Sequence, residues 1–515
     1  MVLLDAGKNP STFEVICNNI SRWLDAAYGS TVVWILSALL LGVGLGYTII
    51  THAMQIRLFP HMLKVVLNSR KGAKDGISSF QAFAIGIAAR VGTGSITGVA
   101  LAVVAGGPGS VFWMWVVAAL GMATAFIEST LAQMFKVRTG DGTFRGGPSF
   151  YIMRGLGSRK WGVVFSVLLI FTYAFAFEMV QANNISTLAK ASFNFPVWAS
   201  AIVLVLLLAP LLLGGMRRIA RFSAWLAPLM SVVYILMGIM VLVLNWREIP
   251  TMFYEIIASA FGGGSYVNPA VAGAGGYFVA TLTNGIKRGL YTNEAGMGSA
   301  PNAAANATVA DPVTQGMVQS MAVFVDTMMI CTTTAFIILL SQPYWDPNRD
   351  EELKGAALTS ASLVHTLGSG QVTETIVAIL IMIMMIAFGY TTLLGNYAYA
   401  ESNWAFIFGT HSSNTVLRVI AICSTAIGAI LPLVVVWSIS DWSFTLMAVV
   451  NLGAVLLLGK WAVGALKDYE AQRKQGIEAP EFCSVDNPHL PGELPTEVWQ
   501  VPGGWDESWA EAKRA

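Results

Sequence analysis

Long apolar segments alternate with short polar segments along most of the chain. A helix that spans a bilayer needs about 20 mostly apolar residues, because it rises about 1.5 Å per residue through a hydrocarbon core of about 30 Å. Eleven segments meet this requirement, at about 31–53, 78–105, 109–135, 161–188, 197–214, 222–245, 274–300, 315–341, 372–404, 415–437 and 442–465. The pattern predicts an all-α polytopic membrane protein with eleven transmembrane helices.

The two ends of the chain are more polar than the segments between them. In the N-terminal segment, apolar residues recur at helical spacing at Phe13, Ile16, Ile20, Trp23 and Ala27. This spacing predicts an amphipathic helix lying on the membrane surface. The segment from about 466 onward is polar and contains prolines and tryptophans, so we expect a poorly ordered tail.

Lysine and arginine gather in alternate loops, and cytoplasmic loops carry an excess of both residues. The loops after the first, third and fifth predicted spans contain Arg57, Lys64, Arg70, Lys71, Lys74, Lys136, Arg138, Arg145, Arg154, Arg159, Lys160, Arg217, Arg218 and Arg221. The intervening loop 346–354 is poorer in cations. We therefore expect a plasma-membrane protein with its N-terminus outside the cell and its C-terminus in the cytoplasm.

Composition agrees with a membrane protein and excludes several other classes. Of the 515 residues, 55% are hydrophobic and 11% are charged, whereas about a quarter of a soluble protein is charged. The net charge of +1 argues against a nucleic-acid partner. Four scattered cysteines favour neither a disulfide framework nor a zinc site. We find no motif for an enzyme, an ATP-driven pump or an organic cofactor.

Two predicted spans contain polar, glycine-rich sequence near their middle, around Gly92–Gly94 and Asn284–Gly285. Glycine destabilises a helix by about 1 kcal/mol relative to alanine. Close helix packing through small residues is one explanation. However, the two interruptions lie five spans apart, in spans of opposite direction. An inverted repeat explains both, with spans 2–6 and 7–11 each opening on a broken helix.

A pair of broken helices provides a binding site for a zwitterion. The half-helix that begins after a break presents free N–H groups and a positive dipole end, which suit a carboxylate. The half-helix that ends before the break presents carbonyls, which suit an ammonium group or a hard cation such as Na⁺. The pattern therefore indicates coupled transport of a small amino acid and a cation.

Six stretches of this sequence resemble the alanine or glycine:cation symporter family, often named sodium:alanine symporters. They are RVGTGSITGVA at 90–100, GGPGSVFWMWVVAALGMATAFIE at 106–128, GGPSFYI at 146–152, KRGLYTNEAGMGSAPNAAA at 287–305, DPVTQGMVQS at 311–320 and VDTMMICTTTAF at 325–336. The resemblance extends over roughly 30–465 and implies sodium-coupled symport of a neutral amino acid.

The family is similar in fold to LeuT-type transporters, which implies a 5+5 inverted repeat plus one extra N-terminal helix. On this basis we divide the chain into 1–30 (extracytoplasmic amphipathic segment), 31–77 (extra N-terminal helix and cytoplasmic loop), 78–246 (first repeat), 247–273 (extracytoplasmic loop), 274–465 (second repeat) and 466–515 (cytoplasmic tail).

The resemblance also implies a substrate site and a sodium site. The N–H groups of Thr93 and Gly94 are expected to receive the substrate carboxylate, and Gln181 is similar to a family glutamine that faces the substrate. The full expected substrate set is Gly92, Thr93, Gly94, Ser95, Gln181, Thr281, Thr283, Asn284, Gly285 and Ile286. The expected sodium ligands are the carbonyls of Ala88, Val91 and Phe388 and the hydroxyls of Thr391 and Thr392.

Two residues depart from the family pattern. Most members have asparagine at the position of Ser95, and many have a bulky residue at the position of Asn284. Both positions lie in the expected pocket. The hypothesis that follows is a substrate larger or more polar than alanine or glycine, such as serine, asparagine or glutamine.

Ionisable residues within spans suggest function by default. We expect Glu128 and Glu401 to pair with lysine or arginine at cytoplasmic helix ends, and Asp326 to form hydrogen bonds between helices. Glu178 is either a structural acid or a proton site or ammonium partner. The three cations Arg90, Lys287 and Arg288 are expected to pair with acids such as Glu294 and to line the inner gate; attraction of the substrate carboxylate is the alternative.

Two rival functions remain beside sodium symport. Proton-coupled relatives of this architecture often place a lysine in the fifth core helix, but the segment 222–245 contains no charged residue, which favours Na⁺. An ion channel usually has a symmetric filter or rings of like charge, and the sequence shows neither. The oligomeric state is open.

Overall fold

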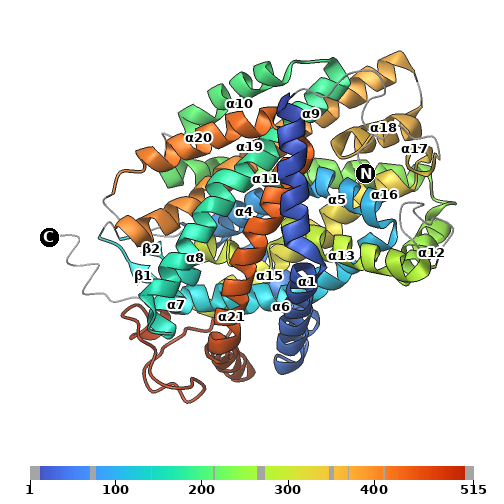
Figure 1. Cartoon of the computed structure of the whole chain (residues 1–515). Coiled ribbons are helices and arrows are strands. Elements are labelled where there is room, and N and C mark those ends of the chain that lie inside the picture. Colours follow the sequence, from blue (N-terminus) through green and yellow to red (C-terminus); the bar gives the residue numbers. More distant parts are fainter. Residues whose placement is uncertain are drawn as a thin grey trace.

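The computed structural model describes residues 12–69, 77–140, 142–212, 215–263, 273–346, 353–368, 370–409 and 412–504. These residues are almost entirely helical (Figure 1). A short antiparallel ribbon pairs β1 (Val137–Arg138) with β2 (Phe144–Arg145), with Val137 opposite Arg145. The predicted all-helical architecture is therefore confirmed.

Among the described residues, seven helical segments are long and apolar enough to cross a membrane. They are α1 (Thr12–Ile50), α6 (Gly109–Met134), α8 (Arg159–Phe171) with η1 (Thr172–Ala176) and α9 (Phe177–Phe193), α11 (Gly215–Leu244), α15 (Pro312–Val323) with η2 (Phe324–Cys331) and α16 (Thr332–Leu339), α19 (Gln371–Phe408), and α21 (Leu433–Lys474). An eighth span is the bent pair of α4 (Ser79–Arg90) and α5 (Gly94–Gly106).

Three other predicted spans are helical but do not meet the same test, so the count of eleven is not confirmed. They are α10 (Val197–Leu212), α13 (Gly273–Asn293) and α20 (Thr415–Ile430). Both α10 and α20 have 16 residues, which makes each about 24 Å long, shorter than the hydrocarbon core. In contrast, α13 is long enough, but it is too polar.

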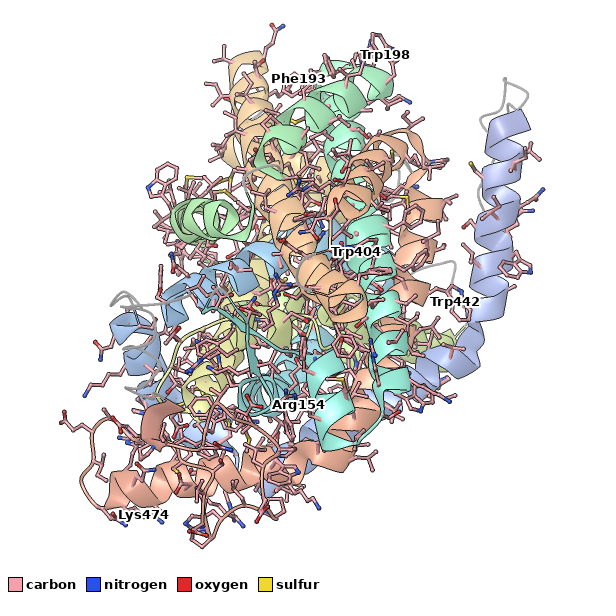
Figure 2. The ribbon with its side chains drawn as sticks, turned by 90° about the vertical axis from the view of Figure 1, so that its left-hand side faces the viewer. Arg154, Phe193, Trp198, Trp404, Trp442 and Lys474 are labelled. Carbon is pink, nitrogen blue, oxygen red and sulfur yellow. The ribbon has the colours of Figure 1, made fainter. Side chains whose placement is uncertain are left out.

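The remaining described helices are short. They are α2 (Met54–Arg57), α3 (Phe59–Asn68), α7 (Pro148–Gly155), α12 (Ile249–Ala260), α14 (Ala300–Ala305), α17 (Gln342–Trp345), α18 (Ala356–Leu367) and η3 (Pro502–Gly504). Figure 2 shows the long axis of the molecule, with Phe193 and Trp198 at one end and Arg154 and Lys474 at the other.

The predicted N-terminal amphipathic segment is helical, and α1 continues from it into the first span without interruption. Here α1 packs along α21 (Figure 1), where the indole N–H of Trp442 donates to the Leu24 carbonyl at 2.9 Å. The polar side, at Ser21, faces the protein, whereas Ile16 and Trp23 are exposed. The described residues of the apolar stripe, Ile16, Ile20 and Trp23, are therefore turned away from the helix bundle. Residues 1–11 of this segment lie outside the described residues.

The second predicted span begins with a strong local signal. The side chain of Ser78 accepts from the Gln81 N–H at 3.2 Å, and the Ser78 N–H donates to the Gln81 side chain at 2.8 Å. This reciprocal capping box satisfies the first free N–H groups of α4. Beyond the break, α5 packs on α13, and α4 packs on α14. The two broken segments therefore lie side by side and run in opposite directions.

The C-terminal segment is not a poorly ordered tail over its described part. Residues 476–504, which we name the C-terminal strap, pack against the ends of α6 and α21 near Arg154 and Lys474 (Figure 2). Trp499 is fully buried, and its indole N–H donates to the Gln133 carbonyl at 2.8 Å. The expectation of disorder missed this docking because it rested on polarity and proline content alone.

Lys136 lies beneath the strap. Its ammonium group lies 4.0 Å from the centre of the Phe144 ring and 4.8 Å from the Trp499 ring. The same group donates to the Ala307 carbonyl at 3.2 Å. Burial and the nearby Arg138 lower the pKa of Lys136 well below its usual value. Lys136 therefore lies between Trp499 of the strap and Ala307, which directly follows α14, so the strap covers this part of the chain.

Candidate functional site

The predicted break of the second span is present. Helix α4 ends at Arg90 and α5 begins at Gly94, and the two axes differ by 41°. The residue after Arg90 leaves helical geometry, with ψ of 73° at Val91. Irregular backbone at this depth requires other polar groups to meet its free N–H and C=O groups.

Gln181 on α9 provides such a group. Its side-chain oxygen accepts from the Thr93 N–H at 3.0 Å and from the Thr93 hydroxyl at 2.7 Å. Asn184, one turn further along α9, donates to the Thr93 hydroxyl oxygen at 2.8 Å. Thr93 and Gln181 are both buried. The structure therefore brings together two residues of the expected substrate set, at the start of α5.

Tyr291 on α13 covers the same break. A Cβ atom on Gly94 would overlap the Tyr291 ring, and Gln181 donates to the Tyr291 hydroxyl at 3.3 Å. The Tyr291 ring also packs on Phe177 and Trp437, with centroids 4.7 Å away in each case. Sequence reasoning missed Tyr291, although it lies in the KRGLYTNEAGMGSAP string that carried the family resemblance.

Oxygen atoms suited to a cation lie on the other side of Gly92. The Thr392 hydroxyl donates to the Ala88 carbonyl at 2.7 Å, and the Thr391 hydroxyl donates to the Phe388 carbonyl at 3.0 Å. A Cβ atom on Gly92 would lie 2.5 Å from the Thr392 hydroxyl oxygen and 2.9 Å from the Gln181 oxygen. Hydroxyl and carbonyl oxygens are ligands that hard cations prefer.

The predicted break at Asn284–Gly285 is wrong. Helix α13 is continuous from Gly273 to Asn293. The side chains of Thr283 and Asn284 donate to carbonyls of their own helix at 2.7 and 2.8 Å. Gly285 permits close packing instead, because a Cβ there would lie 2.6 Å from the Ser110 carbonyl oxygen.

The interruption of the seventh span lies about ten residues later, between α13 and α14. Positive φ angles occur at Glu294 (57°), Gly296 (88°) and Gly298 (79°). Left-handed backbone of this kind ends a helix and favours glycine. The NEAGMGS sequence, not the TNG sequence, therefore forms the break.

The residues 281–286 consequently do not lie at the first break. The Thr281 hydroxyl donates to the Gly106 carbonyl at 2.5 Å, at the end of α5 opposite to Gly94. Twelve residues of helix separate Gly106 from Gly94, which corresponds to about 18 Å. Ile286 is fully buried and lies within the continuous part of α13.

Glu128 on α6 holds the second break open. Its carboxylate accepts from the N–H groups of Gly296 and Gly298 at 3.3 and 3.2 Å, and from the Asn451 side chain at 2.8 Å. Glu128 was expected to pair with lysine or arginine at a helix end. That expectation is wrong because the unwound backbone supplies the donors.

The two breaks meet through an ion pair. The Arg90 guanidinium lies 3.9 Å from the Glu294 carboxylate, and both side chains are buried. Glu294 also accepts from the Tyr173 hydroxyl at 2.8 Å and the Ser299 hydroxyl at 2.9 Å. The expected pairing of Arg90 with Glu294 is therefore present.

Lys287 and Arg288 pair with an acid, as expected, and that acid is Asp441. The Lys287 ammonium lies 2.8 Å from the Asp441 carboxylate, and Arg288 donates to both Asp441 oxygens at 3.1 and 3.2 Å. The Arg288 guanidinium also lies 4.2 Å from the centre of the Trp437 ring. These charges connect α13 to α21.

A cavity of about 570 Å³ opens beside this charged cluster. Its walls include Thr283 and Asn284 of α13, Lys287, Asp441, and Lys354, which precedes α18. The orientation expected from the loop charges puts Lys354 outside the cell. This orientation and the inner gate expected for Lys287 and Arg288 are incompatible with each other, and both stay predictions.

The other acidic residues of the spans have varied environments. Asp326 in η2 accepts from the Ser95 and Thr327 hydroxyls at 2.9 Å each, so the expected hydrogen bonding between helices is present. Glu401 accepts from the Asn414 side chain at 2.6 Å, and the ion pair expected with lysine or arginine is not found among the described residues. Neither oxygen of the buried Glu178 has a hydrogen-bond partner among the described residues.

Comparisons with known proteins confirm the resemblance. A model of the sodium:alanine symporter family matches residues 17–484. The chain is 41% identical over 472 residues to the amino-acid carrier protein AlsT of Bacillus subtilis, covering 92% of this chain and 96% of that protein. It is 40% identical over 459 residues to the probable sodium/glutamine symporter GlnT of Bacillus subtilis, covering 88% and 92%.

Among solved structures, a variant of the manganese transporter of Eremococcus coleocola covers 80% of this chain and 84% of its own chain. The identity is 13% and the TM-score is 0.45. A likeness at this level adds no argument about the fold.

Proposed function

The chain belongs to the sodium:alanine symporter family, and on this premise we propose that it carries a small neutral amino acid into the cell together with Na⁺ by alternating access. This family consists of transporters, not enzymes. The transported amino acid and the coupling ion of this chain are part of the proposal.

The observation that carries the proposal is the position of Gly92. A side chain on this residue would contact both the Thr392 hydroxyl and the Gln181 side chain. The proposed Na⁺ ligands, namely the carbonyls of Ala88, Val91 and Phe388 and the hydroxyls of Thr391 and Thr392, therefore adjoin the proposed carboxylate site. Na⁺ would fix α19 against the broken helix and order the N–H groups that receive the substrate, so each ligand tightens the other.

We assign the substrate to the first break. Its carboxylate replaces the Gln181 oxygen at the Thr93 N–H and also uses the Gly94 N–H, at the positive end of α5. Tyr291 joins the site as a wall for the substrate side chain. From the expected set we retain Gly92, Thr93, Gly94, Ser95 and Gln181, and we assign Thr283 and Asn284 to the approach cavity.

The substrate class follows from polarity along this route. The Ser95 hydroxyl, its partner Asp326 and the cavity residue Asn284 provide polar groups where an alanine carrier needs none. We propose that serine, asparagine or glutamine is accepted beside alanine and glycine. The name of one relative, a probable sodium/glutamine symporter, supports the larger substrates.

The proposed topology has eleven transmembrane helices, with α10, α13 and α20 as the three that are short or polar. The two repeats are 78–246 and 274–465, with 31–77 before them, the loop 247–273 between them and the tail 466–515 after them. The N-terminus and the segment 1–30 lie outside the cell, and the tail lies in the cytoplasm. Support comes from the loop charges and from the antiparallel packing of α4–α5 against α13–α14.

The test is uptake of radiolabelled alanine into proteoliposomes that hold an imposed Na⁺ gradient, with a panel of competing amino acids. Saturable uptake that requires the gradient is the expected result. Uptake that persists without Na⁺ and collapses with a protonophore would favour the proton-coupled alternative. Currents without a saturating substrate would favour a channel. Competition by glycine and alanine alone would remove the larger substrates from the proposal.

A further inference from the structure

Two fully buried polar side chains in the middle of the bundle lack hydrogen-bond partners. Both carboxylate oxygens of Glu178 on α9 are unpaired among the residues that the structure describes, and so are both amide atoms of Asn396 on α19. Each residue has an exposed fraction of 0%. Burial of an unpaired carboxylate is very unfavourable, so the native environment of Glu178 requires a positive charge or a proton.

The packing of α9 on α19 directs the two side chains toward each other. A Cβ atom on Gly389 of α19 would lie 2.5 Å from the end of the Ile185 side chain on α9. Further along, the rings of Tyr173 and Tyr399 lie 5.3 Å apart. The earlier residue of the first segment, Tyr173, contacts the later residue of α19, Tyr399, and the later residue, Ile185, contacts the earlier one, Gly389. The two helices are therefore antiparallel.

Residues seven apart on a helix lie on the same face, two turns from each other. Glu178 precedes Ile185 by seven residues, and Asn396 follows Gly389 by seven residues. Because the helices are antiparallel, both steps lead in the same direction along the interface. Glu178 and Asn396 therefore lie on facing sides of α9 and α19, between the Ile185–Gly389 contact and the Tyr173–Tyr399 contact.

This pair lies next to the proposed transport site. Glu178 lies about one turn of α9 before Gln181, and Asn396 lies about one turn of α19 after Thr392. The π-helical segment η1 ends at Ala176, directly before this turn. Segments of π-helix inside α-helices are frequent at functional sites, because the extra residue redirects the side chains around it.

We propose that Glu178 and Asn396 bind a second coupling Na⁺, one helical turn from the Na⁺ proposed at Ala88 and Thr392. A carboxylate oxygen and an amide oxygen are hard ligands of the kind that such cations prefer. The single positive charge of Na⁺ balances the single negative charge of Glu178. This inference rests on the proposed function, since it sets the number of ions that accompany one amino acid.

The arrangement favours Na⁺ over a proton. A protonated Glu178 is a hydrogen-bond donor and needs an acceptor, yet its oxygens have no bonded acceptor among the described residues. Nor does a lysine or arginine of the described chain form an ion pair with Glu178. An ion with several oxygen ligands satisfies both the carboxylate and the Asn396 oxygen at once.

The test is the substrate gradient that a fixed Na⁺ gradient can sustain in proteoliposomes at zero membrane potential. With two ions per substrate, a tenfold Na⁺ gradient sustains about a 100-fold substrate gradient, and with one ion about a tenfold gradient. We expect the former for the wild type and the latter for Glu178→Gln and Asn396→Leu. Glu401→Gln removes a half-buried acid about 7.5 Å further along α19 than Asn396, outside the proposed ligand pair, and it should match the wild type.

Each other outcome is decisive. An unchanged gradient in Glu178→Gln overturns the second site and leaves the proposed function intact. A wild type that sustains no gradient with Na⁺ overturns the proposed function itself. A third outcome is a Na⁺-driven wild type whose substrate gradient also responds to an imposed pH gradient. If Glu178→Gln loses that response to pH, Glu178 carries a proton and the Na⁺ assignment is overturned.

A second measurement does not require transport. Na⁺ that binds the native state raises the melting temperature of the purified protein in proportion to the number of ions bound. The rise per tenfold Na⁺ concentration should be about half as large in Glu178→Gln as in the wild type. Equal rises in the two proteins would overturn the second site, even if the variant does not transport.

Discussion

At the breaks after α4 and after α13, backbone groups find partners on other spans, whereas at Asn284–Gly285 the helix is unbroken. At the first break, Thr93 is met by Gln181 of a different span, and the loop itself is three residues long. At the second, Glu128 meets two N–H groups across 168 and 170 residues of sequence. At Asn284–Gly285, side chains satisfy their own helix and the helix continues. Glycine weakens a helix, but distant partners decide where it opens.

The largest expected effect is at the second break. Glu128→Ala leaves the Gly296 and Gly298 N–H groups without their acceptor and removes one of the two acceptors of the Asn451 amide. Each unsatisfied buried group costs about 1–3 kcal/mol, so we expect a loss of about 3 kcal/mol or more in the free energy of unfolding. Thermal unfolding of the purified protein measures it, and uptake should be lost.

Glu401→Ala is the matched control for this change, because Glu401 accepts from one side chain and from no unwound backbone among the described residues. Its cost should be about 1 kcal/mol. If Glu128→Ala melts at the temperature of the wild type, the carboxylate does not hold the second break.

Gly94→Ala tests the first break in a similar way. The new methyl group overlaps the Tyr291 ring, and overpacking of this kind costs about 1–3 kcal/mol. We expect the uptake rate to fall about tenfold or more. Gly140→Ala is the control, because a Cβ atom there meets no atom within 4 Å. Equal activity of the two variants would remove Tyr291 from the site.

Thr392→Ala probes the cation side of the first break. Loss of a hydroxyl contact to a charged ligand costs about 1.5 kcal/mol, so the Na⁺ concentration for half-maximal uptake should rise about tenfold. The order of competing amino acids should not change. Thr375→Ala is the control on the same helix, since the Thr375 hydroxyl donates to the Gln371 carbonyl of its own helix. An unshifted Na⁺ dependence in Thr392→Ala contradicts the site assignment.

The smallest effect is expected at the place where no break occurs. Asn284→Ala removes one bond to the helix's own carbonyl and introduces a better helix former, so stability should stay within about 0.5 kcal/mol. Maximal uptake of alanine should be unchanged, and the KM for polar substrates should rise at most about threefold. A loss of Na⁺-driven uptake comparable to that of Gly94→Ala would mean that the helix opens here during transport.

Local signals in the sequence predicted the parts of the fold that depend on nearby residues. The hydrophobic segments, the capped start of α4 and the break at Gly92–Gly94 each rest on residues within one or two turns. The resemblance added Gln181, which does contact Thr93, and paired Thr392 with Ala88, which it does contact.

What the sequence did not predict depends on contacts between distant spans. The Asp441 carboxylate lies more than 150 residues from Arg288, and Glu128 lies 323 residues from Asn451. Neither pairing leaves a periodic signal. The polar string at 281–286 was assigned to a break because side-chain hydrogen bonds within a helix cannot be distinguished from a binding role by composition alone.

The burial of Trp499 matters for anyone who shortens or labels this protein. A chain cut after α21 would lack Trp499. The Lys136 ammonium group would lose its contact with the Trp499 ring, and the Gln133 carbonyl would lose its indole donor. The segment that follows α14 would lose its cover at the same time. Residues 476–504 therefore belong to the folded part of the transporter. A reporter attached beyond residue 504 should leave these contacts in place.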